Sequence, residues 1–162
     1  MRNRTYILIL CFVGLIAYAM VLRNGFVGDD DIQIVRNLPV HSISNFFNFF
    51  TTSTYENAGN DSIVGIFYRP FMMMSFSSMY FLFGPNPAMF HLVQLILQIA
   101  NAVLLYHFLK RFLKEPTAFV CSLLFLIHPI NVEAVVYSAN LQEVLFFAHW
   151  KLPAYLVHQR RT

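Results

Sequence analysis

Charged residues are scarce in this sequence of 162 residues, since only 12% of it is Asp, Glu, Lys or Arg. A soluble globular domain usually carries roughly 25%. Hydrophobic residues make up 57% of the chain, and its 18 Phe suit surfaces that face lipid or the membrane interface. The scarcity of charge excludes an ordinary water-soluble domain and predicts an integral membrane protein in contact with membrane lipids.

Cysteines and clustered basic residues are also scarce. The two cysteines, Cys11 and Cys121, lie within apolar runs and are expected to be small buried residues rather than a disulfide or a metal pair. None of the six histidines stands at a spacing typical of a metal site. The net charge is only +3 and no basic run is interleaved with aromatics, so we expect no nucleic-acid partner.

Three apolar segments are candidates to cross the membrane. Residues 5–22 form an uninterrupted apolar run that, at roughly 1.5 Å per residue, is long enough for one spanning helix. Residues 90–108 and 116–127 are the second and third candidates. Residues 17–19 have the small-x-small form of a signal-peptide cleavage site, but the apolar run continues beyond them, which favours an uncleaved anchor.

Basic residues predict how these spans are oriented. Arg2 and Arg4 precede the first span, and Lys110, Arg111 and Lys114 follow the second. Because basic residues favour the cytoplasmic side, the N-terminus and the second turn are both expected in the cytoplasm. Almost all of the acidic residues then fall on the external side or at its membrane boundary.

The long segment between the first two spans, residues 24–87, is expected to be an external loop that contains interfacial helices. Apolar residues recur at helical spacing over residues 43–50 behind a possible cap at Ser42, which predicts a short helix in the interface or packed on the bundle. A second helix is predicted from Pro70 to Gly84. Its length of about 21 Å is short of the roughly 30 Å hydrocarbon core, so we expect it to be interfacial or re-entrant. The predicted fold is therefore an all-α, polytopic membrane protein with about three spanning helices.

Three adjacent carboxylates, Asp29, Asp30 and Asp31, follow shortly after the first span. Ionised groups beside hydrocarbon lose solvation, and like charges repel, so this cluster is a candidate functional site. The alternative is that Asp caps a short helix that begins at Ile32. The residues alone leave both interpretations open.

Under the predicted topology, further polar residues meet this acidic cluster at the outer membrane boundary. An arginine offers a fixed fork of donors to a phosphate, and an aspartate can take a proton from an acceptor hydroxyl or hold a divalent cation. A helix that restarts after Pro129 would also carry Glu133, Tyr137 and Asn140 on one face. Each residue taken singly also has a structural explanation, but together they indicate a site for a lipid-borne phosphate substrate. The residues expected to bind substrate or phosphate are Arg69, His91, His128 and Glu133.

Four motifs carry a resemblance to a known family. They are Phe26-Val27-Gly28-Asp29-Asp30, Tyr68-Arg69-Pro70, Asn86-Pro87 with His91, and His128-Pro129-Ile130-Asn131-Val132-Glu133-Ala134-Val135. In this order they resemble the motifs of multi-spanning GT-C glycosyltransferases, in the branch related to protein O-mannosyltransferases and to membrane proteins with tetratricopeptide repeats. The resemblance covers residues 1–147, which would form the N-terminal part of such a membrane domain.

The resemblance implies transfer of a sugar from a polyprenyl-phosphate carrier to an acceptor on the external or luminal face of a membrane. That membrane would be the endoplasmic reticulum or a bacterial inner membrane. Asp30, with Asp29 second, would act as general base or as ligand of a divalent cation such as Mg²⁺ or Mn²⁺. Asp31 is extra relative to the family pattern and would cap a helix, and Asn140 stands where the family often has an arginine.

The chain is short for such an enzyme, because these proteins carry many further spans, and no helical repeat of roughly 34 residues is found. Residues 148–162 are atypical and are expected to be a truncated or frameshifted tail. The alternative is a non-catalytic membrane module or an inactive fragment that binds lipid phosphate or partner subunits. A transporter is a weaker option, because residues 5–22 and 90–108 contain no Asp, Glu, Lys or Arg.

Overall fold

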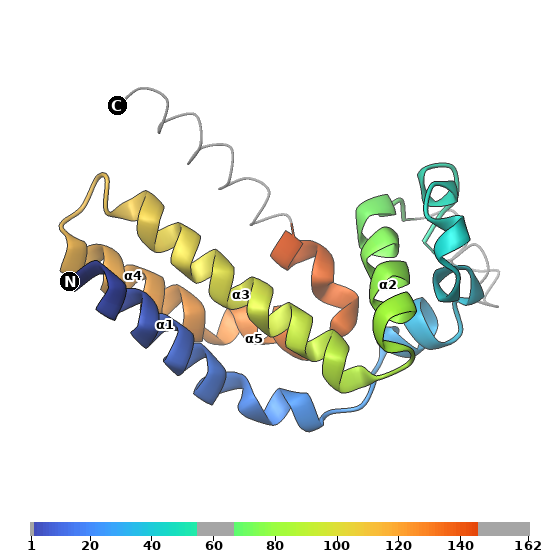
Figure 1. Cartoon of the computed structure of the whole chain (residues 1–162), viewed down its shortest axis with the longest axis horizontal. Helices are drawn as coiled ribbons and strands as arrows, with labels where there is room; N and C mark the ends of the chain where they lie inside the picture. The colour runs from blue at the N-terminus through green and yellow to red at the C-terminus, as the bar shows by residue number, and fades with distance from the viewer. Residues whose placement is uncertain (1, 55–66, 146–162) are drawn as a thin grey trace.

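The structure is a computed structural model that describes residues 2–54 and 67–145 (Figure 1). Within these residues the chain forms helices and turns and no strand, which confirms the all-α prediction. The tail at residues 148–162 lies outside the described residues. The α-helices of the described chain are α1 (Arg2–Tyr18), α2 (Pro70–Phe83), α3 (Pro87–Leu109), α4 (Glu115–Ile127) and α5 (Val132–Val136).

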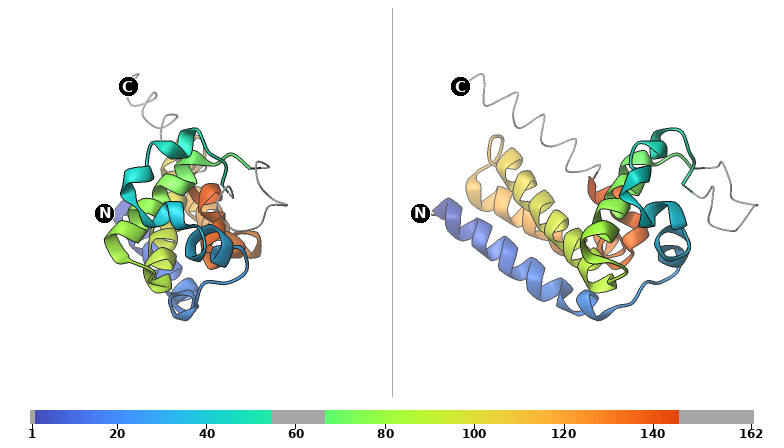
Figure 2. Two further views of the ribbon diagram at one scale, coloured as in Figure 1. Left: turned by 90° about the vertical axis from the view of Figure 1, so that its right-hand side faces the viewer. Right: turned by 45° about the vertical axis from the view of Figure 1, so that its right-hand side comes forward.

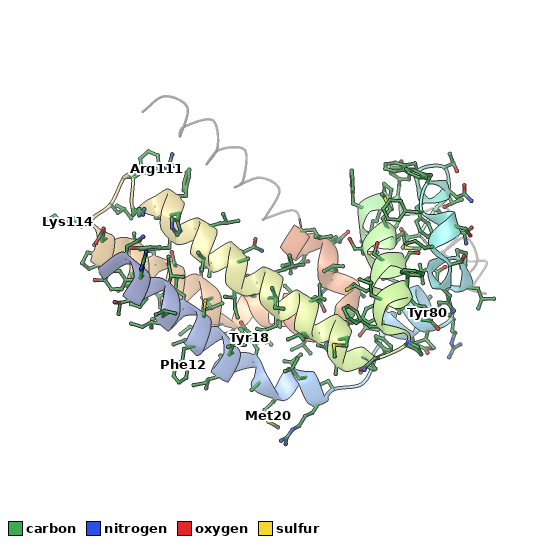
Figure 3. The ribbon with its side chains drawn as sticks, in the orientation of Figure 1. Phe12, Tyr18, Met20, Tyr80, Arg111 and Lys114 are labelled. Atoms are coloured by element: carbon green, nitrogen blue, oxygen red, sulfur yellow. The ribbon has the colours of Figure 1, made fainter. Side chains whose placement is uncertain are left out.

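Helices α1, α3 and α4 lie side by side as a bundle (Figure 1). The start of α1 and the turn from α3 to α4 meet at one end, where Lys110 Nζ donates to Asn3 Oδ1 at 3.3 Å. Arg111 and Lys114 lie at the same end (Figure 3), which we call the basic end. The apolar core between the three helices includes Leu10, Leu95, Ile99, Ala102, Ala118 and Leu126.

The first helix approaches its neighbours closely at Gly14. A Cβ atom at this position would lie 2.7 Å from Ile99 Cγ1 and 3.4 Å from Leu126 Cδ2, so only glycine fits here without a shift of these side chains. On the outer side of the first apolar segment, Phe12 of α1 and Met20 of the following 3₁₀ turn, Ala19–Arg23, are 65% and 67% exposed and point away from the bundle (Figure 3). Apolar side chains outside and close packing inside are what a lipid-facing helix requires.

Two helical segments are long and apolar enough to cross a membrane, namely Asn3–Arg23 and Pro87–Leu109. They correspond to the first two predicted spans. The third predicted span is more complex than a single helix, because α4 has 13 residues and ends at a bend of 50° to Pro129–Val136. The bent pair would make a third span only if both of its parts are counted as one.

The bend after α4 leaves backbone carbonyls without helical partners, and side chains supply the missing donors. Tyr18 Oη donates to the carbonyl of Leu126 at 2.7 Å, and Asn131 Nδ2 donates to the carbonyl of Phe125 at 2.7 Å. Pro129 lacks an N–H and therefore cannot continue the helical hydrogen bonds. The break is thus a built feature of the fold, with its carbonyls bonded from α1 and from the following turn.

Away from the basic end, α2 and residues 31–50 gather around the start of α3 (Figure 2). The predicted helix is confirmed, since α2 begins at Pro70 and is followed by Gly84 at φ +63°, a conformation that favours glycine. A second apolar core forms here. It comprises Ile34, Val40, Phe49, Met72, Met73, Phe76, Met79, Phe90 and Leu141.

Two further helix predictions were wrong. Residues 43–50 form separate 3₁₀ turns, Ile43–Asn45 and Asn48–Phe50, because short polar side chains bond locally instead of supporting a continuous helix. Ser42 caps neither turn, and its hydroxyl contacts that of Ser44 at 2.8 Å. The helix that restarts after Pro129 also stops early, as described below.

Candidate functional site

Of the acidic residues that the structure describes, Asp30 is the one that is fully buried. Its Oδ1 accepts a hydrogen bond from the backbone N–H of Ala139 at 2.6 Å, and its Oδ2 accepts one from Val27 N–H at 3.3 Å. A short π-helical turn, Asp31–Val35, follows, but the Asp30 side chain does not cap it. The capping interpretation is therefore wrong for Asp30, whose carboxylate joins the first loop to a segment far along the chain.

Burial raises the pKa of the Asp30 carboxyl above its ordinary value, because the ionised form loses its water. The backbone N–H groups of Ala139, Val27 and Ser138 and the charge of His91 act in the opposite direction but do not cancel this effect. A carboxylate with a raised pKa binds a proton at a pH closer to neutral, which suits a general base.

His91 is also fully buried and stands on the second turn of α3. Its Nε2 lies 3.4 Å from the carbonyl oxygen of Gly25, and its Nδ1 has no hydrogen-bond partner within the described chain. Its charge lowers the pKa of Asp30, so the structure brings these two predicted residues close together.

Residues 134–139 form a corner that completes the surroundings of Asp30. Helix α5 ends at Val136, Tyr137 is extended at φ −97° and ψ 118°, and a 3₁₀ turn follows at Ser138–Asn140. The predicted single polar face of Glu133, Tyr137 and Asn140 is therefore absent, because the helix does not reach Asn140.

Gln94 of α3 supports this corner. In a continued helix the carbonyl of Ala134 would accept from the N–H of Ser138, but α5 ends at Val136. Gln94 Nε2 donates instead to Ala134 O at 3.1 Å and to Tyr137 O at 2.8 Å. Sequence reasoning missed Gln94, although Gln94, Gln98 and Asn101 recur on one face of an apolar span, a pattern that indicates polar contacts inside a membrane protein.

The remaining acidic and histidine candidates do not reach the buried carboxylate. Asp29, His128 and Glu133 are exposed, and no hydrogen bond joins them to Asp30 in the part of the chain that the structure describes. His128 Nδ1 accepts from the N–H of Ile130 at 3.2 Å and so supports the turn after α4. Asp31 pairs with Arg36 Nε at 2.6 Å.

Arg69 lies at a separate feature, a cavity of about 740 Å³ beside α2. Its guanidinium stands 4.7 Å from the centre of the Phe67 ring. Asp30 does not line this cavity, but residues 139–141 contact both places, since Ala139 N–H donates to Asp30 and Leu141 lines the cavity. Most of the lining is apolar and includes Phe71, Met74, Met79, Val93, Leu97 and Leu145.

The described residues do not fit a divalent cation. They contain no group of three His, Cys, Asp or Glu side chains placed to hold a metal ion. Both oxygens of Asp30 are bonded to backbone N–H groups, and Asp29 is exposed. We therefore derive no chemical step through Mg²⁺ or Mn²⁺.

Curated proteins similar to this chain are protein O-mannosyl-transferases. Protein O-mannosyl-transferase TMTC1 of Mus musculus is 35% identical over 148 residues, which are 90% of this chain and 16% of that protein. TMTC3 of Homo sapiens is 30% identical over 84% of this chain and 15% of its own length. TMTC2 of Mus musculus is 32% identical over 83% of this chain and 17% of its own length. Neither a protein-family model nor a solved structure matches the chain.

The helices and the composition define an integral membrane protein. Over most of its length this protein is homologous to the protein O-mannosyl-transferases of the TMTC group, in agreement with the motifs in its sequence. The chain spans only 15% to 17% of the length of these curated relatives.

Proposed function

We propose that this chain supplies part of the active site of a membrane glycosyltransferase, with Asp30 as general base. The enzyme transfers a sugar from a polyprenyl-phosphate carrier to an acceptor hydroxyl on the external or luminal face, in the endoplasmic reticulum for a protein with these relatives. Mannose is the first sugar to test, because the relatives are protein O-mannosyl-transferases by name. The observation that carries the proposal is a buried carboxylate with a raised pKa, near a buried histidine.

In the proposed step, Asp30 takes the proton of the acceptor hydroxyl while the acceptor oxygen attacks the anomeric carbon of the sugar. A new carbon–oxygen bond forms as the bond from that carbon to the carrier phosphate breaks, with inversion. The carrier leaves as polyprenyl phosphate and keeps the bonding electrons. A general base of matched pKa typically accelerates such a step by roughly 10²–10⁴-fold.

The donor would be held by cationic and apolar groups. Arg69 offers paired donors to the carrier phosphate, and the apolar cavity beside it offers room for part of a polyprenyl chain. Of the other proposed phosphate contacts, His91 is the one whose charge acts on Asp30. His128 and Glu133, which are exposed, would contribute only when substrate is bound.

One observation favours a second candidate, a non-catalytic membrane module. Asp30 has no exposed surface, and both of its oxygens are engaged by backbone N–H groups. In this candidate the Asp30 carboxylate serves only to hold the corner at residues 134–139. In this candidate the chain would bind lipid phosphate or a partner subunit without turnover.

A chimera distinguishes the two candidates. The chain replaces the matched segment of mouse TMTC1, and transfer from mannosyl-phosphoryl-polyprenol to an acceptor peptide is measured in membranes. If Asp30 is the base, Asp30→Asn should lower kcat at least about 100-fold with little change in donor binding. Asp31→Asn, which removes only an exposed ion pair, should retain near-normal transfer.

Near-normal kcat in Asp30→Asn would remove Asp30 from the chemistry. A chimera that is folded, binds the donor and gives no transfer would support the non-catalytic module instead.

A further inference from the structure

Gln94 and Asp30 hold two adjacent peptide groups of the corner. Gln94 Nε2 donates to the carbonyl oxygen of Tyr137 at 2.8 Å, and the N–H of that peptide group, on Ser138, lowers the pKa of Asp30. The next N–H along the chain, on Ala139, donates to Asp30 Oδ1 at 2.6 Å. The corner is therefore clamped between α3 on its carbonyl side and the first loop on its N–H side.

The chemistry of a peptide group links these two contacts. A donor on a carbonyl oxygen withdraws electron density from the peptide, which makes its N–H a stronger donor. Gln94 also fixes Ala134 O at 3.1 Å, so that the backbone is held on both sides of the extended Tyr137. A buried amide in a membrane-spanning helix is costly without partners, and Gln94 Nε2 makes both of its bonds to this corner.

We propose that Gln94 is a positioning residue for Asp30, because it fixes the peptide groups that hold the Asp30 carboxylate in place. This inference rests on the proposed function in one respect, namely that Asp30 is the base whose position matters. The clamp itself is tested by a titration of the Asp30 carboxyl, which requires no transferase activity.

Gln94 does not titrate, so replacing it changes Asp30 through position and hydrogen bonding and not through charge. Of the charged groups nearby, His91 is the one whose charge acts on Asp30. The titratable groups on the elements next to Asp30 are Asp29 and Asp31 with Arg36 on its own segment, His91 on α3, Glu133 on α5 and Tyr137 in the corner.

Gln98 provides a matched control on the same helix. It is 2% exposed, against 1% for Gln94, and it has the same amide group one turn further along α3. Its Nε2 has no hydrogen-bond partner within the described chain and therefore makes no bond to the corner.

The experiment titrates Asp30 in the whole chain, purified in lipid nanodiscs, by infrared spectroscopy of the protonated carboxyl band. Asp30→Asn identifies the band. In Gln94→Met the N–H groups hold the ionised carboxylate less well, so the titration midpoint should rise by roughly half a pH unit to one pH unit. Gln98→Met should leave the midpoint unchanged. Equal midpoints in the native chain and Gln94→Met, or equal shifts in both variants, would overturn the proposal.

Gln94→Asn is the second variant, for the case that Gln94→Met does not fold as judged by circular dichroism. The Asn side chain is shorter than that of Gln by one methylene, so the titration midpoint of Asp30 should again rise. An unchanged midpoint would count against the clamp. The pH profile of transfer in the chimera separates the two proposals. A shifted infrared midpoint with an unmoved profile would retain Gln94 as a positioning residue and reject Asp30 as the base.

Discussion

The two consecutive membrane segments α3 and α4–α5 solve the problem of a hydrophobic environment in different ways. Helix α3 runs for 23 residues without a break, whereas α4 stops after 13 residues and bends by 50° into the next segment. In lipid, each free backbone carbonyl must find a donor within the protein. The comparison teaches that polar side chains on unbroken helices are placed where the broken neighbour lacks donors.

Three side chains show this division of roles. Tyr18, in the first span, donates to Leu126 O at the end of α4. On α3, Gln94 donates to the corner, and Asn101 Nδ2 donates to Val144 O at 2.9 Å. The positions of Tyr18, Gln94 and Asn101 in the continuous spans are therefore explained by the geometry of the segment beside them.

The largest effect on stability is expected when α1 is separated from both of its neighbours, α3 and α4. Gly14→Leu places a side chain where a Cβ atom alone would lie 2.7 Å from Ile99, so we expect a loss of about 3 kcal/mol in the free energy of unfolding. Thermal and detergent unfolding followed by circular dichroism measures it. Phe12→Leu, on the exposed face of α1, is the control and should change stability by less than about 0.5 kcal/mol. Equal stability of the two variants would show that α1 does not pack as described.

A smaller effect is expected from removing a single donor at the bend. Tyr18→Phe keeps the ring but leaves Leu126 O without its bond, which should cost about 1 kcal/mol. The same unfolding measurement applies, with Cys121→Ala on the exposed side of α4 as control. A cost no greater than that of the control would mean that the bend obtains its donor elsewhere.

The smallest effect concerns the pH dependence of stability. Because the pKa of Asp30 is raised in the fold, the folded state holds this proton more tightly than the unfolded state. The stability from the neutral carboxyl is fully present below the ordinary pKa of Asp and is lost as pH rises through the raised pKa. Unfolding of the native chain should therefore become easier over this window relative to Asp30→Asn. Parallel pH curves for the two proteins would contradict the burial of Asp30.

The sequence predicted those elements whose signals are local. Hydrophobic length predicted α1 and α3, and Pro70 with Gly84 predicted the limits of α2. The bend after α4 and the corner at Tyr137 depend on tertiary donors such as Tyr18 and Gln94, which no local pattern identifies. For this reason the sequence did not predict the bend within the third candidate span, and the helix through Asn140 was predicted wrongly.

The candidate site was predictable only in part, because some of its signals are local in the sequence and others depend on tertiary contacts. The acidic motif drew attention to Asp30, and α3 brings His91 close to it. The sequence could not show that Ala139 N–H would select Asp30 and leave Asp29 exposed, because that choice depends on a contact between distant segments.

The most direct test of the whole account is the sidedness of the two ends of the bundle. In a chain with Cys11→Ala and Cys121→Ala, single cysteines at the exposed positions Asp29 and Lys114 are labelled in sealed vesicles with a membrane-impermeant thiol reagent. We predict that Asp29→Cys and Lys114→Cys react from opposite sides of the membrane. Reaction of both from the same side would contradict the account, because the Asp30 site and the basic end could not then face different compartments.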